Sequence, residues 1–484
     1  MTALLLLVIL ADMPGDIRTR TEFSWPEPAG VTENLWAGGN ISFYERLRLH
    51  SEKWEAVVLT EKDAGENWGD LITGGVRYST SDISVSAGAL RTQFARGIVF
   101  SNSGSWSSAD PLALSKAPLS RLRLEPAESP GVTDGNSLTG IGSIWQRGEF
   151  SLYVVLGWSL LDHSGSGLHR TETEEQNKHD AIEKLAAFRA GWGPAGVSFA
   201  AASREGADST VFSRFGADIN LASSAGEISG EILIDTDSTL SFSLSAARGS
   251  ADLRHCLTVS RNSGEIERAS GPYGVSHDLG AGYGVIWKIG NSVVAEAGAL
   301  FLNCGETEMF KSGFLLTERT QGRLEFTQRI KYSDCEGERL IRCRLTESWS
   351  PNSRLTLSVK TPFAFYRNQG GESENGYGLE IRMKHRFSRL IGYSVSAAAS
   401  QTDGWESRIY AYSLSFPGEF GSTVLYGNSL LLQASLSLHI SEDTAVRARF
   451  SRYFREGAEW LGSGSTETPG PFRTTAGCQL DWSF

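Results

Sequence analysis

Basic side chains recur at every second position in the C-terminal half of the chain, the spacing that places residues on one face of a β-strand. Arg329 and Lys331 share such a face with Glu325, and Arg447 and Arg449 share another. The full set of these basic residues is Arg323, Arg329, Lys331, Arg342, Arg344, Arg382, Lys384, Arg386, Arg447 and Arg449. Rings of Arg or Lys inside a pore favour anions and phosphates. If the strands enclose a lumen, these residues predict its selectivity for an anionic solute.

The same residues have a purely structural interpretation. Four acidic residues in this half could pair with many of the cations: Glu296, Glu325, Glu338 and Glu380. A lattice of Arg–Glu pairs would brace a wide barrel without selecting any solute. The cations outnumber these acids, so the anionic solute is retained as a hypothesis.

Residue types suited to nucleophilic catalysis occur together at Asp162, His163 and Ser164. A serine nucleophile needs a base, and the base needs an orienting carboxylate. Three adjacent residues on a Gly/Ser-rich loop rarely adopt that geometry. We therefore predict a solvated loop here, no catalytic residues and no enzyme activity.

A second polar group follows closely in the same region. His169, Arg170 and Glu174 are predicted to form a charged turn or to contact a plug. The eight histidines are dispersed, and the five cysteines include no CxxC pair. These spacings predict no metal site and no cofactor.

Long alternating strands are the elements that would position these residues. In the final segment Leu480 and Trp482 face one way, while Gln479 and Asp481 face the other. Period-two alternation of this kind is typical of strands with one polar face. Further strands are predicted at residues 36–48, 83–94, 150–161, 239–247, 279–289, 292–304, 377–387 and 432–440.

The length of these runs favours a membrane over water. They extend for about 9–11 residues, the length that a tilted strand needs to cross a bilayer. Aromatic residues near strand ends, among them Tyr410, Tyr412 and Phe416, are predicted to form girdles at the headgroups. At about 20–24 residues per strand and connection, the length of the chain predicts roughly 20–24 strands. We therefore predict an all-β fold, a large antiparallel transmembrane β-barrel.

Composition agrees with a barrel. The chain has 484 residues, 53 of them glycine, and a net charge of −11, with no apolar run of the length of about 20 residues that a membrane helix requires. Gly280, Gly282 and Gly284 alternate within a predicted strand, where they would thin the wall or permit a bend. The overall acidity argues against a nucleic-acid-binding surface over the whole chain.

Residues 1–11 are an apolar segment that we interpret as a signal-peptide remnant, a mis-set start or part of a longer chain. Residues 12–484 form the predicted barrel. Its two long loops lie near 103–138 and 162–184, with a short helix expected across 172–187. Trp482 and Phe484 end the last strand, as in the signal read by the barrel-assembly machinery. This ending predicts a protein held in outer-membrane lipid of a Gram-negative cell envelope.

Three segments of the N-terminal half carry a family resemblance: EKDAGE at 61–66, LRTQFARGIVF at 90–100 and GLHRTETE at 167–174. In order and spacing they resemble the barrel portion of Gram-negative helix-hairpin-helix domain-containing proteins. The family has a glycine where this chain has Ala95, and the DNA-binding helix-hairpin-helix module is not within these residues. The resemblance implies an outer-membrane barrel and no established activity.

These observations predict an outer-membrane channel or transporter for a small, anionic solute. A non-transporting barrel that displays surface loops is an alternative, and it predicts a lumen filled by side chains. An accessory barrel in DNA uptake is a further alternative, which a basic lumen favours and the overall acidity opposes.

Overall fold

The computed structural model describes most of the chain. The described residues are 13–95, 97–101, 110–113, 122–127, 138–161, 169–176, 178, 181–205, 210–224, 226–236, 238–250, 252–262, 277–304, 307–320, 323–419 and 421–484. The apolar segment 1–11 and the residues Asp162, His163 and Ser164 lie outside this part.

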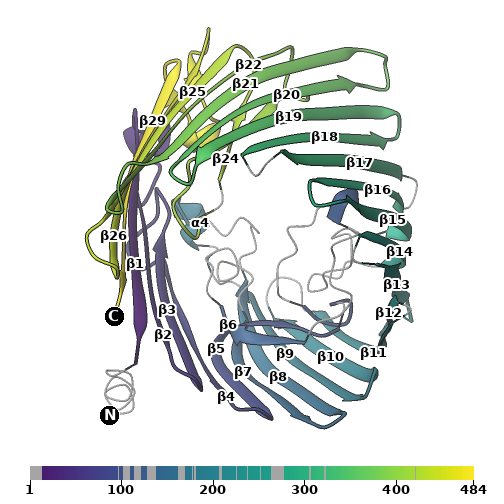
Figure 1. Ribbon diagram of the computed structural model, residues 1–484. Helices are drawn as coiled ribbons and strands as arrows, with labels where there is room; N and C mark the ends of the chain where they lie inside the picture. Colours follow the sequence, from purple (N-terminus) through teal and green to yellow (C-terminus); the bar gives the residue numbers. More distant parts are fainter. Residues whose placement is uncertain are drawn as a thin grey trace.

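The described residues form one closed antiparallel barrel (Figure 1). Twenty-four strands make up its wall, which confirms the prediction from length and alternation. The first strand pairs with the second and also with the last, where Asp16 lies opposite Ser483, so the sheet closes on itself.

The wall strands follow one another in chain order. They are β1 (Gly15–Trp25), β2 (Ile41–His50), β3 (Trp54–Lys62), β4 (Leu71–Ser79), β5 (Ile83–Gln93), β7 (Leu138–Arg147), β8 (Phe150–Leu161), β9 (Ala181–Trp192), β10 (Ala195–Glu205), β11 (Thr210–Ser223), β12 (Gly226–Asp235), β13 (Leu240–Gly249), β14 (Leu253–Asn262), β15 (His277–Ile289), β16 (Val293–Cys304), β17 (Thr307–Thr320), β18 (Leu324–Cys335), β19 (Glu338–Asn352), β20 (Leu355–Arg367), β21 (Ser373–Arg386), β22 (Ile391–Thr402), β25 (Ser429–His439), β26 (Thr444–Arg455) and β29 (Phe472–Ser483).

Alternation along each strand separates an apolar outside from a more polar inside. On β12, Ile228 and Ile232 are exposed on the outer face, whereas Ser229 and Glu231 are buried on the inner face. Large apolar side chains are exposed in the same way around the wall. Exposed apolar side chains on every strand would be unfavourable in water and are suited to lipid. The molecule is therefore a membrane-spanning β-barrel.

No helix among the described residues is long and apolar enough to cross a membrane. The helical pieces are short: α2 (Ala29–Thr32), α4 (Glu172–Gln176), η1 (Pro111–Ala113) and η2 (Gly464–Thr466).

The two ends of the barrel differ in the length of their connections. Short turns such as 51–53 and 193–194 lie at the end that holds both chain termini, here called the short-turn end. All of the long connections lie at the opposite, long-loop end, including 26–40, 63–70 and 403–428. Bacterial outer-membrane barrels show the same asymmetry, with the longer loops outside the cell.

Part of the connection between β5 and β7 is folded into the lumen. Phe94, Ile98 and Phe100 pack against the inner side chains of β8 to β12 in a buried apolar cluster. Glu231 accepts hydrogen bonds from the backbone N–H groups of Ile98 and Val99, at 3.2 and 3.1 Å. Strand β6 (Arg123–Pro126) pairs with the end of β5, so this side of the lumen is largely filled.

Helix η1 from the same connection lies against another part of the inner wall, formed by β15 to β17. Gly284, Gly298 and Gly313 are neighbours across β15, β16 and β17. A Cβ atom at Gly298 would lie 2.0 Å from the carbonyl oxygen of Pro111, and one at Gly313 would meet Leu112. Gly298 and Gly313 therefore admit η1 to the wall.

A second inward segment was not predicted. It is the hairpin of β23 (Ile409–Tyr412) and β24 (Ser422–Leu425) in the connection between β22 and β25. Ile409, Ala411 and Leu425 pack against inner residues of the wall, and Figure 1 places β24 within the outline of the barrel. The prediction that Tyr410, Tyr412 and Phe416 form an aromatic girdle was therefore wrong, because their segment contacts the lumen wall.

Two other boundaries differ from the predictions. The helix expected across 172–187 ends at Gln176, and β9 begins at Ala181. Residues 181–189 alternate between buried and more exposed positions, which is a strand pattern. The strand expected from residue 36 begins at Ile41, because Trp36 belongs to the preceding loop and bridges to Thr171.

Candidate functional site

The inner wall of β18 to β21 carries most of the basic residues predicted from the sequence. Arg329 lies opposite Arg344, and Lys331 lies opposite Arg342, so four cations of β18 and β19 occupy adjacent positions on one face. Lys360 on β20 and Arg382 and Lys384 on β21 extend this face. We call these seven residues the basic wall: Arg329, Lys331, Arg342, Arg344, Lys360, Arg382 and Lys384.

Few carboxylates neutralise the basic wall. Glu380 contacts both Lys360, at 2.7 Å, and Arg382, at 3.2 Å. Of the other acids considered for bracing, Glu325 pairs with Arg319 rather than with the basic wall. Within the described part of the chain, Arg342, Arg344 and Lys384 make no ion pair. The bracing interpretation therefore accounts for only part of this surface.

The remaining carboxylate comes from the inward loop. Asp110, next to η1, accepts hydrogen bonds from Arg329 at 3.2 Å and from Lys331 at 2.7 Å. Burial acts to raise the pKa of Asp110, but the hydrogen bond and the charge of Lys331 outweigh it and hold the pKa below its usual value. Asp110 is thus an ionised bridge between the loop and the wall.

The hairpin β23–β24 covers part of the basic wall with aromatic rings. The guanidinium of Arg342 lies 5.3 Å from the ring of Tyr410, and that of Arg344 lies 5.3 Å from the ring of Tyr412. The backbone carbonyl of Tyr412 accepts a hydrogen bond of 2.7 Å from Arg382. Cation–π contacts attract the rings without cancelling the positive charge.

The cations of β26 are paired, in contrast to those of β19. Arg447 forms an ion pair with Asp481 of β29, which also binds Arg18 of β1. Arg449 pairs with Glu22 of β1 and with Glu419 of the hairpin segment. These residues brace the joint between the first and last strands, as the structural interpretation expects.

The structure locates the rest of the predicted set near the short-turn end. Arg386 is the last residue of β21. Arg323 lies in the turn directly before β18. Lys360 was missed, as were the inward residues Arg18 and Arg46, although the alternation in 15–25 and 41–50 could have shown them.

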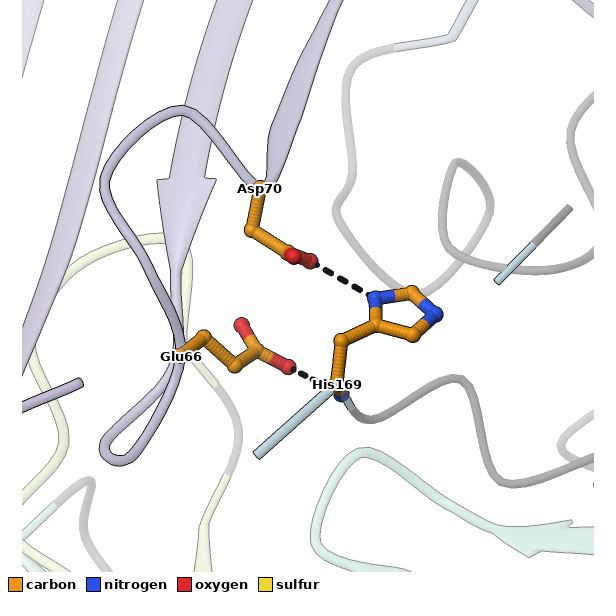
Figure 2. Close-up of side chains that lie close together, drawn as sticks. All are labelled: Glu66, Asp70 and His169. Atoms are coloured by element: carbon orange, nitrogen blue, oxygen red, sulfur yellow. Dashed lines mark hydrogen bonds and ion pairs between the residues drawn. The ribbon is translucent and has the colours of Figure 1, made fainter. Parts of the chain in front are cut away.

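A separate polar cluster joins two loops at the long-loop end (Figure 2). Glu66 accepts a hydrogen bond of 3.1 Å from the backbone N–H of His169, and Asp70 lies 2.9 Å from Nδ1 of the same histidine. Lys178 binds Asp70 at 2.6 Å. Burial raises the pKa of Glu66, although hydrogen bonds from the backbone of Asp63 and His169 oppose this. We call Glu66, Asp70 and His169 the loop cluster.

The loop cluster brings together two of the segments that carry the family resemblance. Arg170 stacks on Trp36 at 5.4 Å, and its carbonyl accepts a hydrogen bond from Ala37, which ties in the loop between β1 and β2. Glu174 accepts hydrogen bonds from the backbone of Arg170 and Thr171 at the start of α4. The residues predicted to form a charged turn or to contact a plug thus lie where loops meet at the long-loop end.

The loop cluster has the side chains of a metal site, since its ligand atoms all lie within 4.8 Å of one another. Its acceptors are already used, however. The two oxygens of Glu66 accept backbone N–H groups of Asp63 and His169, and Asp70 is bound by Lys178 and His169. Lys178 also supplies the positive charge that a cation would bring. We therefore assign no metal to it.

No family model matches the chain, and no curated protein matches it significantly. Several solved structures show a remote likeness. The translocation pore of the P pilus usher PapC is 11% identical over 97% of this chain and 99% of its own length, with a TM-score of 0.47. The ferric-catecholate import receptor Fiu of E. coli K12 is 9% identical over 98% and 82%, with a TM-score of 0.45. The outer membrane channel DcaP of Acinetobacter baumannii is 10% identical over 63% and 97%, with a TM-score of 0.32.

Proposed function

We propose that the protein is an outer-membrane channel for small anionic solutes and that the basic wall is its selective surface. The observation that carries this proposal is the uncompensated charge of Arg342, Arg344 and Lys384, which form no ion pair within the described residues. Glu380 and Asp110 each serve two cations. Uncompensated cations on a lumen wall attract anions and repel small cations.

The two sides of the lumen suit this role differently. The inner face of β8 to β12 is filled by the apolar cluster around Phe94 and Phe100. The charge of Arg189 on this side is neutralised by a bidentate ion pair with Asp218. A solute path is therefore expected along β18 to β22, where positive charge is in excess. The filled side gives the loop-display alternative some support, and the excess charge on the other side favours the channel.

The proposal includes the cellular setting. A barrel with an apolar outer face and its long loops at one end fits the Gram-negative outer membrane. Insertion would depend on the barrel-assembly machinery, with Trp482 and Phe484 as its signal. Membership of the helix-hairpin-helix domain-containing group stays a prediction. The loop cluster supports this membership because it joins segments 61–66 and 167–174. The acidic net charge of the chain argues against nucleic acid as a partner.

Single-channel recording tests the proposal. The refolded protein in a planar bilayer with a tenfold KCl gradient should show steady openings. Its reversal potential should be shifted from zero towards the equilibrium potential of chloride. The double variant Arg342→Gln/Arg344→Gln should bring the reversal potential towards zero. Lys184→Gln is the control. Lys184 lies opposite the exposed residue Trp158 on the outer face of the barrel, so removal of its charge should leave the ion selectivity of the lumen unchanged.

Two results would contradict the proposal. A folded barrel without conductance would favour the loop-display alternative. Cation preference, or equal selectivity of the wild type and the double variant, would show that the basic wall does not control the ion current.

A further inference from the structure

The inner surface of β22 and β25 differs from the basic wall beside it, because it presents hydroxyl and amide groups. Ser394 of β22 pairs with Lys384 of β21 on one side and with Ser435 of β25 on the other, and Ser435 pairs with Arg449 of β26. These four residues form one row across the wall. The neighbouring row holds Arg382, Ser396, Gln433 and Ser451. A strip of neutral donors and acceptors thus separates two lines of cations.

Only one edge of this strip carries free charge. Arg449 is occupied by Glu22 and Glu419, and Arg382 is held by Glu380 and the carbonyl of Tyr412. Lys384 is exposed and makes no ion pair among the described residues. A negatively charged group that enters the strip would therefore be attracted to the Lys384 edge.

The hairpin segment forms a roof over the strip, and between them lies a partly open cavity of about 370 Å³. Lys384, Ser394 and Ser435 line its wall, while Tyr412, Ser415 and Glu419 line its roof. Cavities that bind small molecules have volumes of about 300–1,000 Å³. The hydroxyl of Ser415 has no hydrogen-bond partner among the described residues, so the roof has polar capacity to spare.

The order of these groups selects a type of solute. An ammonium at one side binds a carboxylate, serine hydroxyls donate and accept hydrogen bonds, and a tyrosine ring packs against the C–H face of a sugar ring. The carboxylate of Glu419 in the roof is already bound by Arg449 and by the backbone N–H of Phe416, so the serine hydroxyls are the groups left to recognise a solute hydroxyl. A fitting solute has one anionic end and a hydroxyl-rich remainder.

We propose that this cavity is a binding subsite for a monosaccharide carboxylate, with the carboxylate on Lys384 and the sugar hydroxyls on Ser394 and Ser435. This inference rests on the proposed channel function and names its class of solute. It distinguishes the strip from the basic wall, which would attract any small anion.

Calorimetry on the full-length protein in detergent tests the subsite without requiring conduction. Three probes separate charge from hydroxyl recognition: glucuronate has both, glucose has only the hydroxyls, and cyclohexanecarboxylate has only the charge. We expect glucuronate to bind at least about tenfold more tightly than either of the others, which is the effect of one or two hydrogen bonds to a charged or polar partner.

Variants assign the binding to the cavity. Lys384→Gln should weaken glucuronate about tenfold and leave glucose unchanged. Ser394→Ala/Ser435→Ala should weaken glucuronate and leave cyclohexanecarboxylate unchanged. The matched control is Ser348→Ala/Ser358→Ala, which removes two inner-face hydroxyls of β19 and β20 outside the cavity.

The outcomes of this subsite test and of the channel test are distinguishable. Equal affinity for glucuronate and cyclohexanecarboxylate, or glucuronate binding that both cavity variants leave intact, would overturn the subsite even if the channel is anion-selective. Glucuronate binding with the expected variant effects, in a protein that conducts no ions, would uphold the subsite and refute the channel.

Discussion

Ala95 has a backbone conformation that is unfavourable for alanine. Its φ is +41°, in the left-handed region that costs a residue with a Cβ atom roughly 1–2 kcal/mol. The resembling family has glycine here. The residue lies in the tight turn between Phe94 and Gly97, where the N–H of Gly97 binds the carbonyl of Phe94. The turn aims Phe94 and Phe100 into the apolar cluster, so the strain is offset by burial.

Replacing Ala95 with glycine should relieve this strain. The loss of one buried methyl group costs about 0.8 kcal/mol, which is close to or smaller than the strain removed. We expect Ala95→Gly to leave the free energy of unfolding unchanged or to raise it by up to about 1 kcal/mol. Denaturant unfolding of the refolded barrel measures this.

Ala87→Gly is the matched control, because Ala87 lies within β5, where its φ is not positive. Glycine in a strand interior costs roughly 0.5–1 kcal/mol relative to alanine. If both variants lose the same stability, the turn at Ala95 is not strained.

Sequence reasoning at the level of single residues identified faces but not partners. A period of two fixes which side of a strand a residue occupies, so the inward position of Arg342 and Arg344 followed from alternation alone. The partners depend on loops that return from distant parts of the chain. Asp110 binds Lys331 across 221 positions of sequence, and no local pattern signals such a contact. The meeting of Glu66 with His169 was missed for the same reason.

At the level of elements, η1 is held to the wall by one carboxylate whose ionisation can be tested. The pKa of Asp110 is held below its usual value, so the ion pairs with Arg329 and Lys331 stabilise docking above the unfolded pKa of about 3.9. That stabilisation is lost as the pH falls through the lower, folded pKa. Conductance of the wild type should therefore stay constant from neutral pH to about pH 4 and change only below it.

Asp110→Asn should remove this pH dependence, because an amide cannot form the ion pair at any pH. The variant should show at neutral pH the conductance that the wild type reaches only in acid. Asp252→Asn, in the exposed turn between β13 and β14 at the short-turn end, is the control and should behave as the wild type. A variant identical to the wild type at every pH would mean that Asp110 does not hold the loop.

The hairpin β23–β24 makes a second prediction at this scale. Ser400 lies opposite Ser429, so the strand ends on either side of the hairpin segment are adjacent. A short Gly-Ser linker can therefore replace residues 404–427. The wall should still close, and the conductance should rise on the order of twofold because the roof over the lumen is gone.

Shortening the turn 368–372 at the same end of the barrel is the control, because it removes residues that lie outside the lumen constriction. Its conductance should equal that of the wild type. Unchanged conductance after removal of the hairpin would show that the segment does not narrow the path.

Alternation predicted the wall strands more reliably than the inward elements. The strands at 150–161, 279–289 and 292–304 lie within two residues of the observed bounds. Strand β23 has only four residues, and Tyr410 and Tyr412 alternate in it as aromatic residues do at the rim of a wall strand. Periodicity says that two faces differ, but it does not say which surface they meet. The girdle prediction failed on this point.

For the whole molecule, length and alternation were sufficient to predict a closed barrel, because each strand with its connection uses a similar number of residues. The filling of the lumen could not be predicted in this way. It depends on which of the long connections fold inward, and apolar residues such as Phe94 look the same in sequence whether they face lipid or an inner cluster.

The unequal ends of the barrel predict how it sits in the membrane. The long loops and the connection that carries the hairpin β23–β24 leave the wall at one end, and the termini lie at the other. In an outer membrane the long-loop end faces the exterior.

An epitope inserted between Gly370 and Gly371, in the turn between β20 and β21, should therefore be stained by antibody on intact cells. The same epitope between Glu442 and Asp443, in the turn between β25 and β26, should be stained only after the outer membrane is permeabilised. Both turns are exposed and lie outside the strands, so each insertion should leave the barrel folded. The reverse pattern of staining would place the loop cluster on the periplasmic side, and solutes would then meet the short-turn end first.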